Sequence, residues 1–196
     1  MPYLDHFGLI APFYDRVIRM QSREKLIALA GLSNGSRLLD AGGGTGRISQ
    51  GLRELAASIV VVDESMGMLQ QAMSKGGLET VCALTEHLPF DNQSFDCVLM
   101  IDALHHVFNQ QHTISELWRV LKVGGRIVVE EPDIQKTSVK LIALFEKLAL
   151  MRSHFLTSRE IVALFKKYPS ARIHTEKEGF NVWVLVEKQS PLLDRE

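Results

Sequence analysis

Glycines and acidic residues in the first third of the chain have the types and spacing of a ligand-binding turn. In the stretch LLDAGGGTGRIS, an aspartate precedes glycines at every second position: Asp40, Gly42, Gly44 and Gly46. Such a cluster marks a tight turn where the backbone comes close to something else, which we expect to be a ligand. Asp63 follows about twenty residues after the first glycine, where a carboxylate commonly accepts hydrogen bonds from two ribose hydroxyls.

The spacing of the glycines distinguishes this turn from phosphate-binding turns. A dinucleotide fingerprint needs glycines at i, i+2 and i+5, but the last position is Arg47 counted from Gly42 and Ser49 counted from Gly44. The chain also lacks a GxxxxGK[ST] loop. Because the Asp40 carboxylate would repel a diphosphate, a ligand that carries positive charge fits better. We therefore expect a ribose without a pyrophosphate.

Two histidines are the candidates for proton transfer. His105 and His106 follow a strand expected at 97–101, at the sheet edge where a substrate should lie. A histidine titrates near working pH, so either ring could take a proton from a substrate hydroxyl or carbon. The alternative is that one ring packs beneath the loop and orders it. Asp102, Glu130 and Glu131 also lie at strand ends, and we expect solvated carboxylates there, although Glu131 could face an acceptor.

The elements that must position these residues alternate between strands and helices. Apolar runs predict strands at 37–41, 58–63, 80–84, 97–101 and 126–130. Helical spacing predicts helices at 11–30, 47–55, 65–75, 113–122, 141–148 and from a capping box at 157–160 onward. The segments 171–178 and 180–188 predict an antiparallel hairpin joined through Gly179. Because the strands are apolar on both faces, we expect a doubly wound α/β fold with helices on both sides.

Particular side chains are expected in the core. Met66, Leu69 and Met73 share one face of the helix at 65–75. Ile114, Leu117, Trp118 and Leu121 form a stripe on the helix at 113–122, and Trp183 also reads as a core residue. Cys82 and Cys97 lie in strand-like runs, where we expect small apolar side chains and no metal site or disulfide.

Length and charge narrow the classes of protein. The 196 residues carry a net charge of -1, which gives no basic field for nucleic acid. We expect one domain over 1–196, with a helical cap at 1–35, a cofactor-binding half at 36–132 and substrate-side helices with the hairpin at 133–196. The chain shows no membrane-length apolar run and no signal-peptide pattern, so we expect a cytoplasmic protein without a membrane span.

Several separated motifs resemble one family. LLDAGGGTG, VVDESMGML, EHLPFDNQSFDCVLMIDALHHV and ELWRVLKVGGRIVVEEP together are similar to the class I S-adenosylmethionine-dependent methyltransferases, in the small type-11 group with ubiquinone/menaquinone-biosynthesis-like enzymes. The resemblance implies a Rossmann-like, mostly parallel seven-stranded sheet whose last strand is antiparallel. It also implies S-adenosylmethionine as cofactor and S-adenosylhomocysteine as product.

The resemblance implies a role for individual residues. Gly42 and Gly44 would contact the methionine moiety, Asp63 both ribose hydroxyls, and Glu64 and Met68 would flank the adenine. Thr85 would meet the adenine through its backbone, and Glu86 matches a frequent family glutamate. Leu84 departs from the family, which often has an acidic residue there to accept a hydrogen bond from the adenine amino group.

Further residues complete the expected cofactor site. Asp40, Gly46 and Ile101 belong to the same strand ends. The segment IAPFYDRVI is similar to the aromatic-Tyr-Asp segment with which these enzymes cover the cofactor, and this places Tyr14 at the entrance. Alternatively, Phe13 and Tyr14 only pack on a helix face.

The expected activity is methyl transfer to a small apolar or aromatic molecule. Two amphipathic stretches, KLIALFEKLALM and FLTSREIVALF, are candidate walls of its pocket. Because a sulfonium already activates its methyl group, alignment of the acceptor can supply most of the catalysis. A non-catalytic cofactor-binding protein and a nicotinamide-dependent reductase are the alternatives, and the missing glycine register speaks against the reductase. The oligomeric state stays open.

Overall fold

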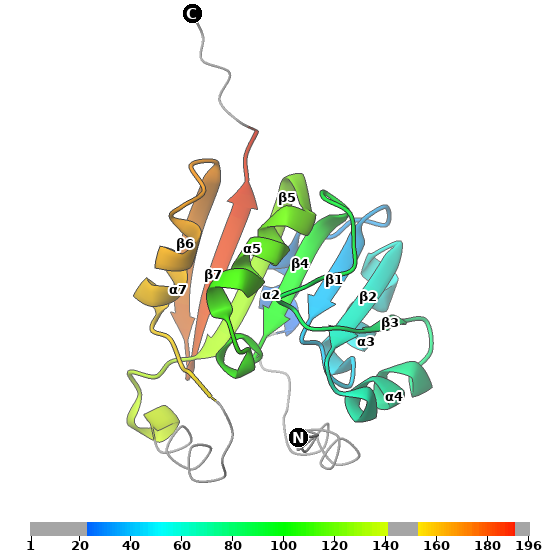
Figure 1. Cartoon of the computed structure of the whole chain (residues 1–196), viewed down its shortest axis with the longest axis horizontal. Coiled ribbons are helices and arrows are strands. Elements are labelled where there is room, and N and C mark those ends of the chain that lie inside the picture. Colours follow the sequence, from blue (N-terminus) through cyan, green and yellow to red (C-terminus); the bar gives the residue numbers. More distant parts are fainter. Residues whose placement is uncertain (1–22, 141–152, 191–196) are drawn as a thin grey trace, which may run out of the picture.

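One sheet organises the molecule (Figure 1). The computed structural model describes residues 23–140 and 153–190, and these contain seven strands in the order β3-β2-β1-β4-β5-β7-β6. The strands are β1 (Arg37–Ala41), β2 (Ser58–Asp63), β3 (Glu79–Cys82), β4 (Phe95–Ile101), β5 (Leu121–Pro132), β6 (Ala171–Glu178) and β7 (Asn181–Lys188). Strands β1 to β5 pair in parallel, whereas β7 is antiparallel to both β5 and β6. The doubly wound fold and the antiparallel last strand are therefore confirmed.

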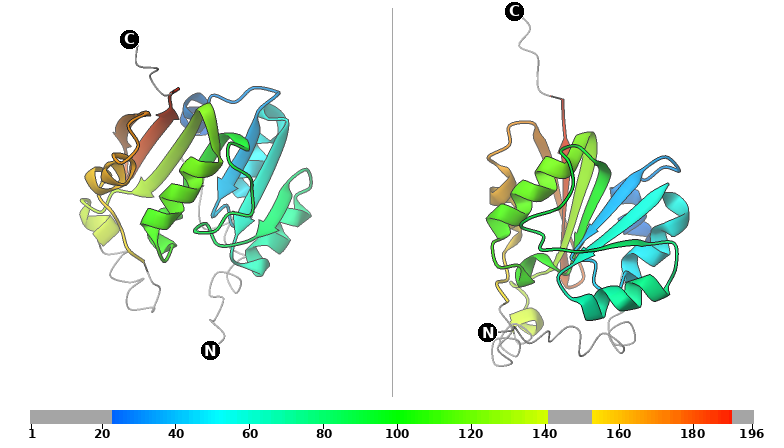
Figure 2. Two further views of the ribbon diagram at one scale, coloured as in Figure 1. Left: turned by 45° about the horizontal axis from the view of Figure 1, so that its top comes forward. Right: turned by 45° about the vertical axis from the view of Figure 1, so that its right-hand side comes forward.

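Helices lie on both faces of the sheet (Figure 2). They are α2 (Arg23–Ala30), α3 (Arg47–Leu52), α4 (Met66–Ser74), α5 (Gln110–Val120) and α7 (Ser158–Phe165), with short 3-10 turns η1 (Arg53–Leu55) and η2 (Leu104–His106). The buried side chains of α5 and α7 join one core cluster, and those of α2 and α3 join a second cluster on the other face. Among the helices described here, none has both the length and the hydropathy that crossing a bilayer requires.

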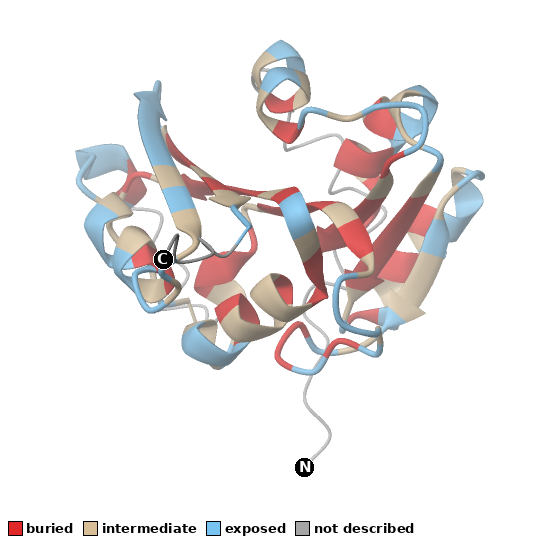
Figure 3. Ribbon diagram, turned by 90° about the horizontal axis from the view of Figure 1, so that it is seen from above, coloured by how far each residue is buried: buried red, intermediate tan, exposed pale blue. Residues whose placement is uncertain are grey.

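The central strands are buried on both faces, as their apolar runs predict (Figure 3). Successive side chains of a strand point to opposite faces of the sheet. In β5, Val129 therefore joins the cluster beneath α5 and α7, and Val128 joins the cluster beneath α2 and α3. The same alternation places Glu130 and Glu131 on opposite faces where β5 ends.

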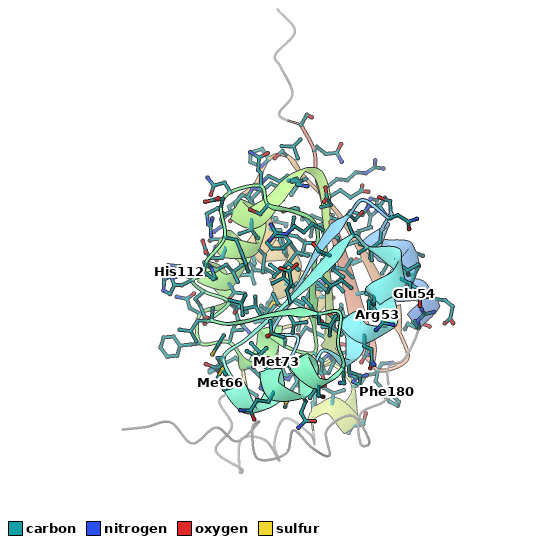
Figure 4. All side chains as sticks on the ribbon, turned by 90° about the vertical axis from the view of Figure 1, so that its right-hand side faces the viewer. Arg53, Glu54, Met66, Met73, His112 and Phe180 are labelled. Atoms are coloured by element: carbon teal, nitrogen blue, oxygen red, sulfur yellow. The ribbon has the colours of Figure 1, made fainter. Side chains whose placement is uncertain are left out.

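The predicted buried face of α4 is wrong for two of its three residues. Met66 and Met73 are 48% and 51% exposed, whereas Met68, Leu69 and Ala72 are buried. Figure 4 shows both exposed methionines on the outer side of the helix. Helix α4 packs against β2 and β3, and its buried residues Met68, Leu69 and Ala72 form the surface that meets them. The predicted apolar stripe shared only Leu69 with this surface.

Of the other core predictions, one holds in part and one fails. Trp118 is partly buried and packs against the cluster beneath α5 and α7; its ring stacks on Tyr168 at 4.4 Å and lies beneath the Lys188 ammonium at 5.0 Å. Cys82 is exposed on the edge strand β3, whereas Cys97 and Trp183 are buried as expected. The helix predicted at 11–30 is described only from Arg23 onward, where α2 ends at Ala30 as predicted. The helix predicted at 141–148 lies outside the described residues.

The predicted capping box begins α7. The Thr157 hydroxyl accepts a hydrogen bond from the Glu160 N–H at 3.3 Å, and the Glu160 carboxylate accepts from the Thr157 N–H at 2.7 Å. Ile161 and Phe165, which follow, are fully buried against the sheet. The box therefore fixes where the helix starts relative to the core.

We predict that Thr157→Ala lowers the free energy of unfolding by about 1 kcal/mol, because one N–H at the helix start loses its acceptor. Thr157→Ser keeps the hydroxyl and is expected to stay close to the wild type. Urea unfolding monitored by circular dichroism measures both variants. Equal stability of the alanine and serine variants would contradict the capping role.

Candidate active site

The candidate residues meet where the parallel strands end. The glycine turn follows β1, Asp63 closes β2, and the histidines follow β4. Because β1, β2, β4 and β5 are parallel, these segments share one edge of the sheet, the lower edge in Figure 1. This is the edge at which open α/β sheets bind ligands.

The glycine turn has a backbone that other residues adopt only with strain. Gly42, Gly44 and Gly46 have φ angles of 72°, 54° and 67°, in the left-handed region. The N–H groups of Gly42 and Gly43 both donate to the Val62 carbonyl, at 2.8 and 3.1 Å, which holds the turn against β2. The positive φ angles explain the repeated glycines that the sequence shows.

Asp63 binds the turn directly. Its Oδ2 accepts a hydrogen bond from the Gly44 N–H at 2.9 Å, and its Oδ1 accepts from the Ser65 N–H at 2.8 Å. A Cβ built on Gly44 would lie 3.9 Å from both Asp63 Oδ2 and Met68 Sδ. The absent side chain of Gly44 therefore leaves room beside a carboxylate and a thioether. The structure brings together three residues predicted to contact the cofactor.

Asp40 lies beneath the turn. Its carboxylate is 1% exposed and accepts a hydrogen bond from the Ser49 hydroxyl at 2.7 Å. A Cβ on Gly43 would lie 2.6 Å from the Asp40 carboxyl carbon. Burial raises the pKa of Asp40 to about 6. Asp40 supports the turn from the protein side, and its expected contact with the cofactor stays a prediction.

Thr85 and Glu86 connect the loop after β3 to the start of α5. The Thr85 hydroxyl lies 3.2 Å from the Thr113 hydroxyl and 3.4 Å from Glu86 Oε2. Glu86 Oε1 accepts a hydrogen bond from the Asn109 N–H at 3.0 Å. Both side chains are buried among protein groups, so a contact of Thr85 with adenine would depend on its backbone.

The other predicted cofactor residues occupy different environments. Glu64 is exposed after β2, and Ile101 is partly buried at the end of β4. Leu84, where the family often has an acid, is 48% exposed after β3. Tyr14 lies outside the described residues.

Glu131 is buried, which overturns the expectation of a solvated carboxylate. Its Oε2 lies 2.6 Å from His105 Nδ1, and its Oε1 accepts hydrogen bonds from the N–H groups of Ala103 and Leu104 at 3.1 and 2.7 Å. The His105 ring stacks on Phe155 with a centroid distance of 4.3 Å. The Glu131 carboxylate can be buried because the loop after β4 supplies hydrogen-bond donors to both of its oxygens.

His106 is the more exposed of the two histidines. Its Nδ1 lies 3.3 Å from the Ser153 hydroxyl, and its ring centroid is 3.9 Å from that of His105. Burial, with a smaller effect of His105, lowers the pKa of His106 to about 3. His106 is therefore neutral at pH 7, and this low pKa works against a role as general base.

Glu130 is also buried rather than solvated. It lies on the opposite face of β5 from Glu131, and its Oε1 accepts a hydrogen bond from the Asn181 amide of β7. Burial and the nearby Asp102 carboxylate raise the pKa of Glu130 to about 7. Asp102 has a φ of 53°, a strained conformation at the end of β4. The contact between Glu130 and Asn181 was not predicted from the sequence, because it depends on the pairing of β5 with β7.

No group of three or more His, Cys, Asp and Glu side chains suited to a metal ion occurs within residues 23–140 and 153–190.

We predict that Gly42→Ala destabilises the protein more than Gly76→Ala. Both glycines have left-handed φ angles, 72° and 68°, so both alanines cost on the order of 1–2 kcal/mol of backbone strain. Only at Gly42 would the new Cβ meet a neighbour, Ala103 Cβ at 2.8 Å, whereas Gly76 has nothing within 4 Å. Chemical denaturation should show an additional loss of about 1 kcal/mol or more at Gly42.

The Ala103→Gly background provides the control. Removing that methyl group should reduce the difference between the two alanine variants. A difference that persists in this background would mean that the Ala103 contact is not its cause.

Buried Asp40 and Glu130 also predict how stability depends on pH. Their folded-state pKa values, about 6 and about 7, exceed the ordinary values of 3.8 and 4.5. The folded protein therefore binds more protons than the unfolded chain between those limits, and the free energy of unfolding falls as pH rises through this window. We expect Glu130→Gln to reduce the pH dependence of the free energy of unfolding in the upper part of this window, toward pH 7. Asp40→Asn should reduce it in the lower part.

Urea unfolding of the wild type and the two variants at several pH values measures this effect. If Glu130→Gln keeps the wild-type slope, another group is responsible for the titration.

Comparison with known proteins shows which proteins the chain is similar to. Residues 39–129 match the family model described as a methyltransferase domain. The Demethylmenaquinone methyltransferase of Thermobifida fusca is 33% identical over 138 residues, which cover 64% of this chain and 58% of that protein. The Ubiquinone/menaquinone biosynthesis C-methyltransferase UbiE of Haemophilus ducreyi is 33% identical over 115 residues, 54% of this chain and 44% of that protein. The chain thus spans about half the length of these curated relatives.

A solved structure agrees on the fold. The methyltransferase in the complex with the Haloferax volcanii Trm112 methyltransferase activator superposes with a TM-score of 0.81 at 17% identity, covering 96% of this chain and 100% of that chain. At this identity the likeness concerns the fold alone. The glycine turn and Asp63 both lie within the segment that matches the family model. Residues 39–129 are thus similar to the methyltransferase-domain family, as the motifs of the chain predicted.

Proposed function

We propose that the chain is an S-adenosylmethionine-dependent methyltransferase that acts on a small apolar or aromatic molecule. The observation that carries this proposal is the arrangement of Gly44, Asp63 and Met68. A turn without a side chain lies beside a carboxylate that can accept ribose hydroxyls and a thioether that can contact a flat base. The absence of a dinucleotide glycine register supports adenosine without a diphosphate.

The residues of the turn fit the proposed cofactor. Gly42 and Gly44 would hold the methionine moiety, Asp63 would hold the ribose, and Glu64 and Met68 would flank the adenine. When bound, S-adenosylmethionine supplies a methyl group that its sulfonium has already activated, and transfer yields S-adenosylhomocysteine and one proton. The acidic surroundings, with Asp40 beneath the turn and Asp63 beside it, suit a ligand that carries positive charge.

The acceptor would lie beside the loop after β4. His106 and Phe155 would face the acceptor, and the buried His105 ring packs between them, tilted by 46° against His106 and stacked on Phe155. Packed rings form an apolar wall that suits an aromatic acceptor. His106, neutral at pH 7, can accept a hydrogen bond from an acceptor hydroxyl, although its low pKa disfavours full proton transfer.

The names of the relatives suggest a first acceptor. Those proteins are called demethylmenaquinone and ubiquinone/menaquinone C-methyltransferases. We propose a quinone-type acceptor in its reduced form, because a hydroquinone ring carbon is electron-rich enough to attack a methyl group. The net charge of -1 favours such a small molecule over nucleic acid.

One observation favours a second candidate, a protein that binds the cofactor without catalysis. Leu84 is exposed where related enzymes often carry an acid, so one expected adenine contact is absent. Such a protein would bind S-adenosylhomocysteine but form none from S-adenosylmethionine with any acceptor.

We predict that Asp63→Ala weakens S-adenosylhomocysteine binding by about 1.5–3 kcal/mol, the usual loss when a charged hydrogen-bond partner is removed. Asp91→Ala, on an exposed turn, is the matched control and should bind as the wild type does. Isothermal titration calorimetry measures the affinities, and circular dichroism checks that both variants fold. Unchanged affinity of folded Asp63→Ala would contradict the proposed ribose site.

Activity is tested with S-adenosylmethionine and a reduced, short-chain demethylmenaquinone. Formation of S-adenosylhomocysteine that depends on the acceptor supports methyl transfer to a quinone. Tight cofactor binding without transfer to this or other aromatic acceptors would favour the non-catalytic candidate.

A further inference from the structure

One carboxylate collects the hydrogen-bond donors of the loop after β4. Glu131 accepts from the N–H groups of Ala103 and Leu104 and lies 2.6 Å from His105 Nδ1. The side chains of His105 and Glu131 are each only 3% exposed. A buried carboxylate needs such donors, and three from consecutive residues determine the shape of the loop.

On one side, this loop packs against the glycine turn. A Cβ on Gly42 would lie 2.8 Å from Ala103 Cβ, so the Gly42 backbone lies too close to the Ala103 methyl group for a second methyl group to fit between them. A displacement of Ala103 toward the turn would therefore displace Gly42. The hydrogen bond from Ala103 to Glu131 fixes that approach.

On the other side, the loop holds residues 153–155. The His105 carbonyl accepts a hydrogen bond from the His154 N–H at 2.7 Å, and the His105 ring stacks on Phe155 at an interplanar angle of 17°. The Gln110 side-chain amide donates to the carbonyls of Leu104 and His154, at 3.1 and 2.7 Å. The proposed acceptor wall is thus attached to the loop that Glu131 shapes.

Glu131 also determines the protonation of the His105 ring. A carboxylate only accepts hydrogen bonds, so the 2.6 Å contact requires a proton on Nδ1. The same contact fixes the plane of the ring, and this plane is the one that stacks on Phe155. The ring thereby transmits the position of Glu131 to the acceptor side.

We propose that Glu131 and His105 are a pair of positioning residues that aligns the acceptor wall with the cofactor turn. The inference rests on the proposed methyl transfer. It adds that the pair acts by geometry and does not touch the reacting atoms. Because a displacement of about 1 Å can cost roughly a hundredfold in rate, such a pair affects turnover far more than cofactor affinity.

The first test is the protonation of the His105 ring, read by ¹⁵N NMR of the histidine side chains. In the wild type we expect a proton on Nδ1. Glu131→Gln keeps the size of the side chain and one acceptor oxygen for the backbone N–H groups, but it turns an amide NH₂ toward His105. The ring should then carry its proton on Nε2 only. Glu54→Gln, at the exposed site labelled in Figure 4, should change nothing.

The second test separates turnover from binding. With reduced short-chain demethylmenaquinone, Glu131→Gln should lower kcat roughly a hundredfold, while its Kd for S-adenosylhomocysteine stays within about twofold of the wild type. His105→Gln should lower kcat similarly. The double variant should lose no more than either single variant, because the two residues act as a unit.

The outcomes distinguish the inference from the proposed function. An unprotonated Nδ1 in the wild type, an unchanged ring in Glu131→Gln, or an unchanged kcat in that variant would each overturn the positioning pair. A loss of cofactor affinity equal to the loss of kcat would also overturn it. Wild-type protein that neither binds S-adenosylhomocysteine nor transfers methyl groups would refute the proposed function instead. The ring measurement on the wild type needs neither an acceptor nor a folded variant.

Discussion

The carboxylate of Asp63 is the interaction on which the candidate site depends. It accepts backbone N–H groups from Gly44 in the turn after β1 and from Ser65 at the start of α4. Two segments that belong to different β-α units are thereby held at one carboxylate. The left-handed glycines follow from this constraint, because the chain must reverse within a few residues to bring the Gly44 N–H to Asp63. The room left beside Gly44 is a consequence of the same geometry.

Carboxylates at strand ends stabilise this edge of the sheet in a shared way. Asp40 accepts from the Ser49 hydroxyl beneath the turn, whereas Glu86 accepts from the Asn109 N–H before α5 and Glu131 from N–H groups of the loop after β4. Loops between buried elements carry N–H groups that no strand or helix partner satisfies, and each group left unpaired is costly. The acidic residues meet that need. Raised pKa values at Asp40 and Glu130 are the electrostatic cost of burying carboxylates in this layer.

The sequence predicted the order of elements well, since local patterns determine it. Alternating strands and helices, the capping box at Thr157 and the hairpin through Gly179 each have a short-range signal. The buried face of α4 was wrong because apolar spacing counts Met66 and Met73 without showing which side meets β2 and β3. Hydrophobic periodicity identifies a helix better than it identifies the helix's neighbours.

The polar side of the site could be predicted only in part. Asp63 and the glycines lie close in sequence to the turn that they form, so their spacing was informative. The burial of Glu131 was not predictable, because its partners at 103–105 lie in the loop after β4 and meet it only when β4 pairs with β5. The contacts of His105 with 154–155 likewise join segments about fifty residues apart.

The central claim is that the turn of Gly42 to Gly46, with Asp63, holds an adenosine-bearing sulfonium and not a dinucleotide. Isothermal titration calorimetry of the wild-type chain with S-adenosylhomocysteine and, separately, with NAD tests it most directly. The account predicts saturable binding of one S-adenosylhomocysteine per chain and no heat of binding with NAD. Saturable binding of NAD, or no binding of S-adenosylhomocysteine by folded protein, would contradict it.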